Sequence, residues 1–190
     1  MNKALVVGPR LYLRLLAAED VPSLSAAELL ETETWYSESG RIPISKMAFT
    51  HMLDEKQGSP PERFRFAICL RESDESIGMT NIREIDWLNR NAETGTRIYD
   101  AKYRNAGYGT EAKHLVLRYA FEVLGMHAMR SDVFAPNTRS AAALIKQGYR
   151  PAGRIEAEVC RRGVYYDALV FDLLRPEWEA AFAEWTTNYA

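Results

Sequence analysis

Hydrophobic residues alternate with polar ones in much of the first half of the chain and recur every three or four residues in parts of the second half. Alternation places neighbouring side chains on opposite faces of a strand, whereas a spacing of three or four places them on one face of a helix. The alternation predicts strands over residues 10–15, 64–70, 76–86 and 92–99. Short polar turns separate the last three, so these are expected to form an antiparallel meander.

The helical spacing is clearest over 112–123, in a helix that ends near Gly125. A strand over 127–135 follows, and then a helix that begins after Asn137 and ends at Gly148. The other predicted elements are helices over 19–30 and 45–57, a hairpin over 149–160 and 164–173, and a terminal helix over 176–189, whose Trp178, Phe182 and Trp185 either pack on the domain or form a dimer contact. The order predicts a mixed α/β fold in one domain over residues 1–190.

Composition narrows the class of protein. The 190 residues are 47% hydrophobic and 26% charged, which is typical of a globular domain. A formal net charge of −2 disfavours nucleic acid as a partner, and no apolar run approaches the roughly 18 residues of a membrane span. The spacing of Cys69 and Cys160 suits neither a metal site nor a disulfide framework. We therefore expect a cytoplasmic protein that binds no membrane, nucleic acid or metal.

A glycine-rich segment, residues 103–110, lies directly before the long helix. Gly107 and Gly109 leave backbone N–H groups uncovered where the helix begins, and with the positive end of the helix dipole these donors form an anion site. An equally acceptable interpretation is a turn that needs glycine only for its backbone geometry. The segment is not a Walker loop, and the dinucleotide-binding pattern would need glycine at Ala112.

Arg104-x-x-Gly107-x-Gly109 resembles the pyrophosphate-binding motif of the GNAT superfamily of N-acetyltransferases. The similarity extends in order and spacing to Ala92-Glu93, Asp132-Val133-x-x-Pro136-Asn137-x-x-Ser140, Lys146-x-Gly148-Tyr149 and Gly163-x-Tyr165-Tyr166-Asp167. The branch that it resembles contains the ribosomal-protein N-terminal acetyltransferases (the Rim type). The resemblance implies a mostly antiparallel twisted sheet with one parallel pair splayed around the cofactor and helices on both faces.

The resemblance also implies acetyl-CoA as the cosubstrate. Residues 104 to 109 would bind its pyrophosphate through backbone N–H groups, and the end of the preceding strand would pair with the pantetheine arm. Asn137 would bind the pantetheine, although an asparagine there is equally explained as a helix N-cap. The cofactor-binding residues expected in this way are Ile98, Tyr99, Arg104, Asn105, Ala106, Gly107, Tyr108, Gly109, Thr110 and Asn137.

Acetyl transfer needs a neutral amine and a donor for the tetrahedral oxyanion. The resemblance implies that Glu93 is the general base, directly or through water, although a glutamate on the solvent face of a strand is common. Asp86 is a weaker alternative for the base. The backbone N–H of Ile98 is the candidate oxyanion donor.

The departing thiolate needs a proton donor. Many GNAT enzymes carry a tyrosine seven residues after the asparagine, but here that residue is Leu144. The Rim-type branch has a serine three residues after it, which is Ser140, so this hydroxyl is the expected donor. Tyr149 is interpreted as a core residue rather than an acid.

The acceptor amine is not readable from the sequence. Acceptor specificity in the superfamily comes from segments that correspond here to Glu31–Ser45 and Val159–Tyr166. The first is acidic with two aromatic residues, and the second contains Arg161 and Arg162, so their charges conflict. Three functions stay open: an acetyltransferase for a protein α-amine or peptide, one for a small amine such as a polyamine or aminoglycoside, and a non-catalytic acyl-CoA-binding module. The protein is expected to be a monomer or a homodimer.

Overall fold

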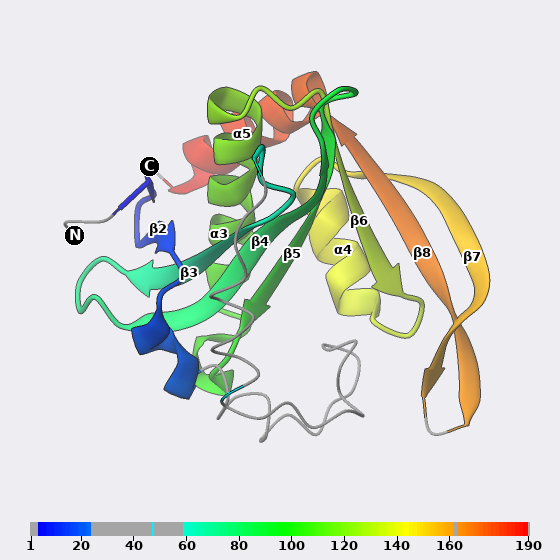
Figure 1. The fold of residues 1–190 in the computed structure, drawn as a ribbon, viewed down its shortest axis with the longest axis horizontal. Helices are drawn as coiled ribbons and strands as arrows, with labels where there is room; N and C mark the ends of the chain where they lie inside the picture. The colour runs from blue at the N-terminus through cyan, green and yellow to red at the C-terminus, as the bar shows by residue number, and fades with distance from the viewer. Residues whose placement is uncertain (1–3, 24–46, 48–58, 162, 190) are drawn as a thin grey trace.

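The computed structural model describes residues 4–23, 47, 59–161 and 163–189. Its described strands form one eight-stranded sheet in the order β1-β2-β3-β4-β5-β6-β8-β7 (Figure 1). The strands are β1 (Val6–Val7), β2 (Leu11–Leu15), β3 (Phe64–Leu70), β4 (Ser76–Asp86), β5 (Asn91–Ile98), β6 (Ala128–Phe134), β7 (Arg150–Arg161) and β8 (Val164–Leu174).

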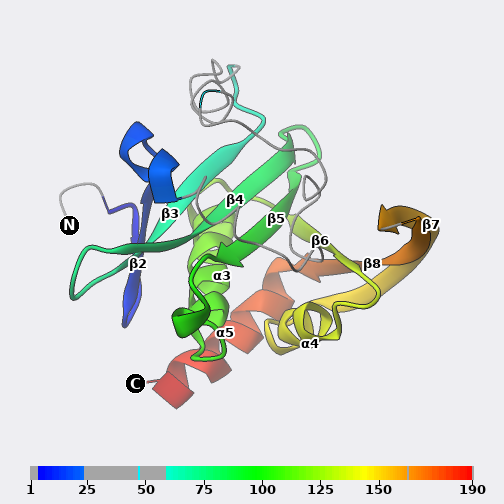
Figure 2. The same cartoon turned by 90° about the horizontal axis from the view of Figure 1, so that it is seen from below.

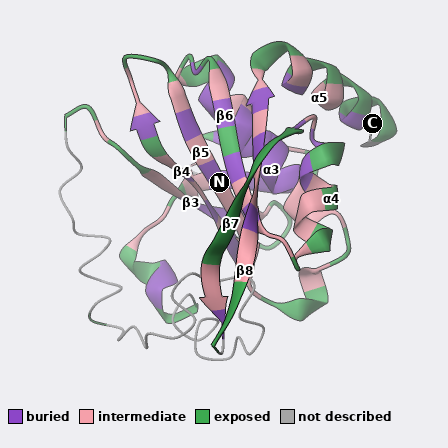
Figure 3. Ribbon diagram, turned by 90° about the vertical axis from the view of Figure 1, so that its right-hand side faces the viewer, coloured by how far each residue is buried: buried purple, intermediate pink, exposed green. Residues whose placement is uncertain are grey.

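The predicted strands are confirmed to within about one residue at either end, apart from β1, which the sequence analysis did not predict. Strands β3 to β5 form the expected antiparallel meander, and β2 pairs antiparallel with β3. Strands β5 and β6 are the one parallel pair in the described sheet, as the resemblance implies. Strand β7 lies at the edge and is exposed along most of its length (Figure 3).

Three helices lie on the same face of the sheet: α3 (Tyr108–Arg118), α4 (Thr138–Lys146) and α5 (Arg175–Tyr189) (Figure 2). Helix α3 continues into a π-helical turn, η4 (Tyr119–Val123), so the predicted long helix changes its hydrogen-bond spacing before it ends. The N–H of Leu124 accordingly bonds to the Tyr119 carbonyl at 3.1 Å. The predicted helices over 19–30 and 45–57 lie mostly outside the described residues; the described start is a 3-10 turn, η1 (Ala18–Asp20).

Helix α3 is buried on nearly all sides rather than on one apolar face. Every residue from 111 to 117 is buried, including Glu111, Lys113 and His114. The periodicity of apolar residues identified the helix but could not show that charged positions also lie inside, because β2, β5 and α5 cover its other sides.

Aromatic side chains of α5 pack against α3 and η4. The Trp178 ring stacks on Phe121 with centroids 5.2 Å apart, and the Trp185 ring lies 5.0 Å from His114. Phe182 lies between the two tryptophans, with centroid distances of 5.1 and 5.8 Å. This apolar face is therefore used within the domain, which decides between the two interpretations of the terminal helix.

His114 is fully buried, and neither ring nitrogen has a hydrogen-bond partner among the described residues. Burial lowers its pKa from 6.5 to about 4. Between these values the unfolded chain binds a proton that the folded protein does not, so stability should fall as pH decreases from 6.5 to 4. His114→Phe should remove this loss and make the protein up to about 2 kcal/mol more stable than wild type at pH 5, measured by urea unfolding. If His114→Phe changed the free energy of unfolding by the same amount at pH 7 and pH 5, the buried neutral His114 would not be the cause of the loss.

Cys69 is buried and is not joined to Cys160 by a disulfide. Within the described ranges, no helix combines the length and the apolar character needed to cross a membrane.

Candidate active site

Strands β5 and β6 separate partway along their length. Their pairing runs from Asn91 opposite Ala128 to Glu93 opposite Arg130, and it stops there although β5 continues to Ile98. A cavity of about 1600 Å³ occupies the gap. Its walls come from β4, β5 and β6, the loop before α3, and helices α3, α4 and α5. The splayed parallel pair expected from the resemblance is therefore present.

The free edge of β5 presents backbone donors to this gap. The Tyr99 N–H donates to the Ile77 carbonyl of β4 at 2.9 Å, and the Gly95 N–H donates to Asn81 Oδ1 at 3.1 Å. Because successive amides of a strand point to opposite sides, those of Thr96 and Ile98 face β6 and the cavity. Of the two strand residues expected to pair with the pantetheine arm, only Ile98 directs its amide into the gap.

The glycine-rich loop turns sharply at two residues with positive φ, Asn105 at 63° and Gly107 at 82°. Gly107 is the N-cap of α3, so the amides that follow it are the first-turn donors that a helix leaves unbonded within itself. The loop is anchored to the end of β5, because the guanidinium of its own Arg104 donates to the carbonyls of Ile98 (3.1 Å) and Tyr99 (2.9 Å). The backbone of this loop therefore forms a cradle with the geometry of an anion site.

A second clamp on this loop comes from Arg10, directly before β2. Arg10 Nη1 donates to the Ala106 carbonyl at 2.9 Å, and the Arg10 guanidinium lies 4.4 Å from the centre of the Tyr108 ring. Arg10 also pairs with the fully buried carboxylate of Glu111 at 2.8 Å. Tyr108 faces this clamp and Tyr103 rather than the cavity, so any role of Tyr108 in binding a cofactor belongs to its backbone.

Helix α4 brings three predicted positions to the opposite wall. Asn137 and Ser140 both line the cavity, and Asn137 Oδ1 caps the helix by accepting the Ser140 backbone N–H at 3.1 Å. Leu144 also lines it, at the position where a tyrosine donor would stand. Tyr149 is 2% exposed, and its hydroxyl lies 2.8 Å from Thr94 Oγ1, which confirms that it is a core residue.

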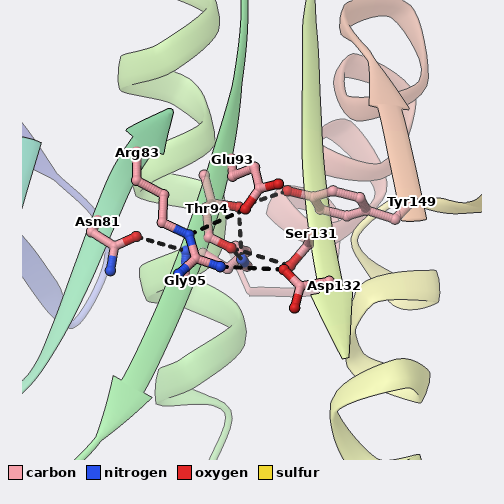
Figure 4. Close-up of polar contacts among 9 residues, drawn as sticks. Asn81, Arg83, Glu93, Thr94, Gly95, Ser131, Asp132 and Tyr149 are labelled. Carbon is pink, nitrogen blue, oxygen red and sulfur yellow. Dashed lines mark hydrogen bonds and ion pairs between the residues drawn. The ribbon is translucent and has the colours of Figure 1, made fainter. Parts of the chain in front are cut away.

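Glu93 lies beside the cavity but is not part of its wall. Arg83 of β4 is in the wall and bridges two carboxylates, with Nε 3.2 Å from Glu93 Oε2 and Nη2 3.2 Å from Asp132 Oδ1 (Figure 4). Burial raises the pKa of Glu93, and the charge of Arg83 opposes that rise. A carboxylate with a raised pKa is a suitable proton acceptor near neutral pH. The sequence analysis missed Arg83 and named Asp132 only as part of a motif, because isolated charges on strands carry no signal that they will meet.

Asp86, the weaker candidate for the base, lies at the turn between β4 and β5. It accepts hydrogen bonds from the Asn89 backbone N–H at 2.9 Å and from Asn89 Nδ2 at 2.7 Å. These hydrogen bonds lower the pKa of Asp86. It does not line the cavity, and its hydrogen bonds are those of a residue that stabilises a turn.

A polar group closes the narrow end of the gap, where β5 and β6 separate. Lys113 Nζ donates to the Thr94 carbonyl (3.1 Å) and to Thr94 Oγ1 (2.8 Å). Ser131 Oγ donates to the same carbonyl at 3.1 Å (Figure 4). Thr94, Lys113, Ser131 and Tyr149 are called the apex cluster below. Burial lowers the pKa of Lys113 to about 7. This cluster could not be predicted from the sequence, since a lysine in an amphipathic helix usually faces water.

The described residues contain no group of three or more His, Cys, Asp or Glu side chains that could hold a metal ion.

The acetyltransferase (GNAT) domain model matches residues 10–150 of this chain. The chain belongs to the GNAT acetyltransferase family. As a member it is an acetyl-CoA-dependent N-acetyltransferase.

YoaA of Bacillus subtilis (strain 168), an uncharacterized N-acetyltransferase, is 28% identical over 173 residues, which are 88% of this chain and 94% of that protein. YdaF of the same organism, named provisionally as a ribosomal N-acetyltransferase, is 28% identical over 102 residues, or 54% of this chain and 55% of that protein. Among solved structures, spermidine N-acetyltransferase from Vibrio cholerae with CoA and spermine has the same fold, with a TM-score of 0.80 at 19% identity over 90% of this chain and 99% of that one.

Proposed function

We propose that this GNAT enzyme transfers acetyl from acetyl-CoA directly to a protein N-terminal α-amine in a ternary complex. The observation that carries the coenzyme part of the proposal is the presence of two groups of backbone donors, one in the loop before α3 and one on the free edge of β5. The loop amides over 105–110 bind the diphosphate, whereas the Arg104 N–H is already bonded to the Ala101 carbonyl at 3.0 Å, and the β5 edge at Ile98 binds the pantetheine arm. These two groups of donors fit a long, flexible ligand with an anionic end.

Each catalytic role is assigned to a group that lies at the gap between β5 and β6. Because the Ile98 N–H is used by the pantetheine arm, the Thr96 N–H, which also faces the gap and lies nearer Thr94, donates to the oxyanion of the tetrahedral intermediate in place of Ile98. Such a donor contributes about 3 kcal/mol in enzymes of this kind. Glu93 removes the proton from the attacking ammonium through a water molecule, because Arg83 rather than Glu93 lines the cavity. The Ser140 hydroxyl donates to the sulfur as the thiolate leaves, since Leu144 cannot donate.

The proposed acceptor rests on the Rim-type motifs and on the similarity to YdaF. A polyamine is the second candidate, because the structurally similar Vibrio cholerae enzyme is a spermidine N-acetyltransferase. A thiol-release assay with acetyl-CoA separates them. The enzyme should release CoA from acetyl-CoA when the acceptor is a peptide with a free N-terminus. It should not do so with N-terminally blocked peptides or with spermidine. Faster release with spermidine than with any peptide would favour the second candidate.

Ser140→Ala tests the proton donor without disturbing the helix cap, which uses the backbone N–H of Ser140 rather than its hydroxyl. Turnover should fall about tenfold, the value of one hydrogen bond to a developing charge, and acetyl-CoA affinity should change little. Steady-state kinetics and calorimetry measure the two quantities. Equal losses in turnover and affinity would count against a role at the leaving group.

A further inference from the structure

The apex cluster stands where the β5–β6 ladder would otherwise continue. After Glu93 and Arg130, the next hydrogen bond of a parallel pair would join the Thr94 carbonyl to an amide of β6. That carbonyl instead accepts the Ser131 hydroxyl and the Lys113 ammonium, each at 3.1 Å. Side chains thus replace the backbone ladder, and they form the closed end of the cavity.

Lys113 is an uncommon residue for such a position. It is 5% exposed, and no carboxylate in the described ranges forms an ion pair with it. Its hydrogen-bond partners are the neutral oxygens of Thr94. The charges that act on it are those of Arg83, which disfavours the ammonium, and Asp132, which favours it. A buried amine without a paired carboxylate lowers stability, and such groups concentrate at functional sites.

The direction of the bound coenzyme makes this end the acyl end, a step that rests on the proposed function. With the diphosphate at the loop over 104–110 and the pantetheine arm along the β5 edge, the thioester points toward Thr94 and away from the loop. Lys113, Thr94 and Ser131 all line the cavity there.

We propose that Lys113, held by Thr94 and Ser131, is the residue that restricts this enzyme to the acetyl group. A longer acyl chain would place its extra methylene groups against hydrogen-bonded polar atoms, where burial gains little and breaking the hydrogen bonds is costly. The acetyl methyl group is short enough to avoid them. The apex cluster is therefore a polar end wall that selects chain length.

The test compares acetyl-, propionyl- and butyryl-CoA as donors for wild type and for Lys113→Met, which keeps an unbranched chain but removes the amine. Wild type should strongly prefer acetyl-CoA. In Lys113→Met the ratio of kcat/KM for propionyl-CoA to that for acetyl-CoA should rise at least about tenfold, the usual value of one methylene in an apolar pocket. Lys102→Met, at an exposed lysine outside the cavity, should leave the ratio unchanged.

Thr94→Val is a second variant, which removes the hydroxyl bonded to Lys113. It should also raise the ratio of kcat/KM for propionyl-CoA to that for acetyl-CoA. This variant tests the proposal if Lys113→Met does not fold. An unchanged ratio in folded Lys113→Met, or in Thr94→Val, would overturn the inference. So would a wild type that uses propionyl-CoA or malonyl-CoA as well as acetyl-CoA. Absence of calorimetric binding of acetyl-CoA to wild type would instead reject the coenzyme placement on which the inference rests.

Discussion

Gly107→Val is expected to abolish acetyl-CoA binding, with an affinity loss of at least about 100-fold. Gly107 has φ at 82°, a conformation that a β-branched residue hardly adopts. The valine would therefore turn the loop and move the first amides of α3 away from the diphosphate. Two hydrogen bonds to a charged group, at about 1.5–3 kcal/mol each, account for the loss. Isothermal titration calorimetry measures it directly.

Gly125→Val is the matched control for this experiment. Gly125 also has a positive φ, 69°, but lies beyond the far end of the same helix, and a side chain there would meet nothing within 4 Å. Both variants introduce the same strained residue, so both should lose stability, whereas only Gly107→Val should lose the coenzyme. Normal affinity in folded Gly107→Val would reject the loop as the diphosphate site.

The strands and helices were largely predictable because each follows from a local pattern. Strands β3 and β4 match the predicted ranges, since their alternation is bounded by polar turns. Helix α4 begins after Asn137 and ends before Gly148 as expected, because both residues carry a local role: a side-chain cap and a φ of 93°. The π-helical end of α3 was not predictable, since its apolar residues keep the helical spacing while the hydrogen bonds change.

The site was predictable where a motif marks it, in the loop before α3 and at the start of α4. The loop over 104–110 follows from its glycines, but the apex cluster joins residues of β5, β6 and α3 with Tyr149, directly before β7, and these meet only in the folded chain. The same limit applies to Tyr99. Its position in the motif suggested a contact with the cofactor, yet the pairing of β5 with β4 points its amide the other way. Which side of a strand faces a gap depends on register, and register is a tertiary property.

Glu93→Gln is expected to lower kcat at least about 100-fold, because the amide cannot accept the proton of the acceptor amine. Acetyl-CoA affinity should be unchanged, since Glu93 does not line the cavity. In wild type, kcat/KM should fall at low pH, as the carboxylate is protonated below its raised pKa. This acidic limb should disappear in the variant. Rates measured from low pH to pH 9 with a fixed acceptor check both expectations.

The Arg83→Met variant distinguishes a catalytic role of Glu93 from a purely structural role of its ion pair with Arg83. The positive charge of Arg83 lowers the pKa of Glu93, so removing it should raise that pKa and move the acidic limb to higher pH. Turnover at pH 9 should then stay much closer to wild type than in Glu93→Gln, because the base is still present. If the ion pair itself were what mattered, both variants would lose similar activity at every pH. An acidic limb that keeps its position in Arg83→Met would remove Glu93 from the mechanism.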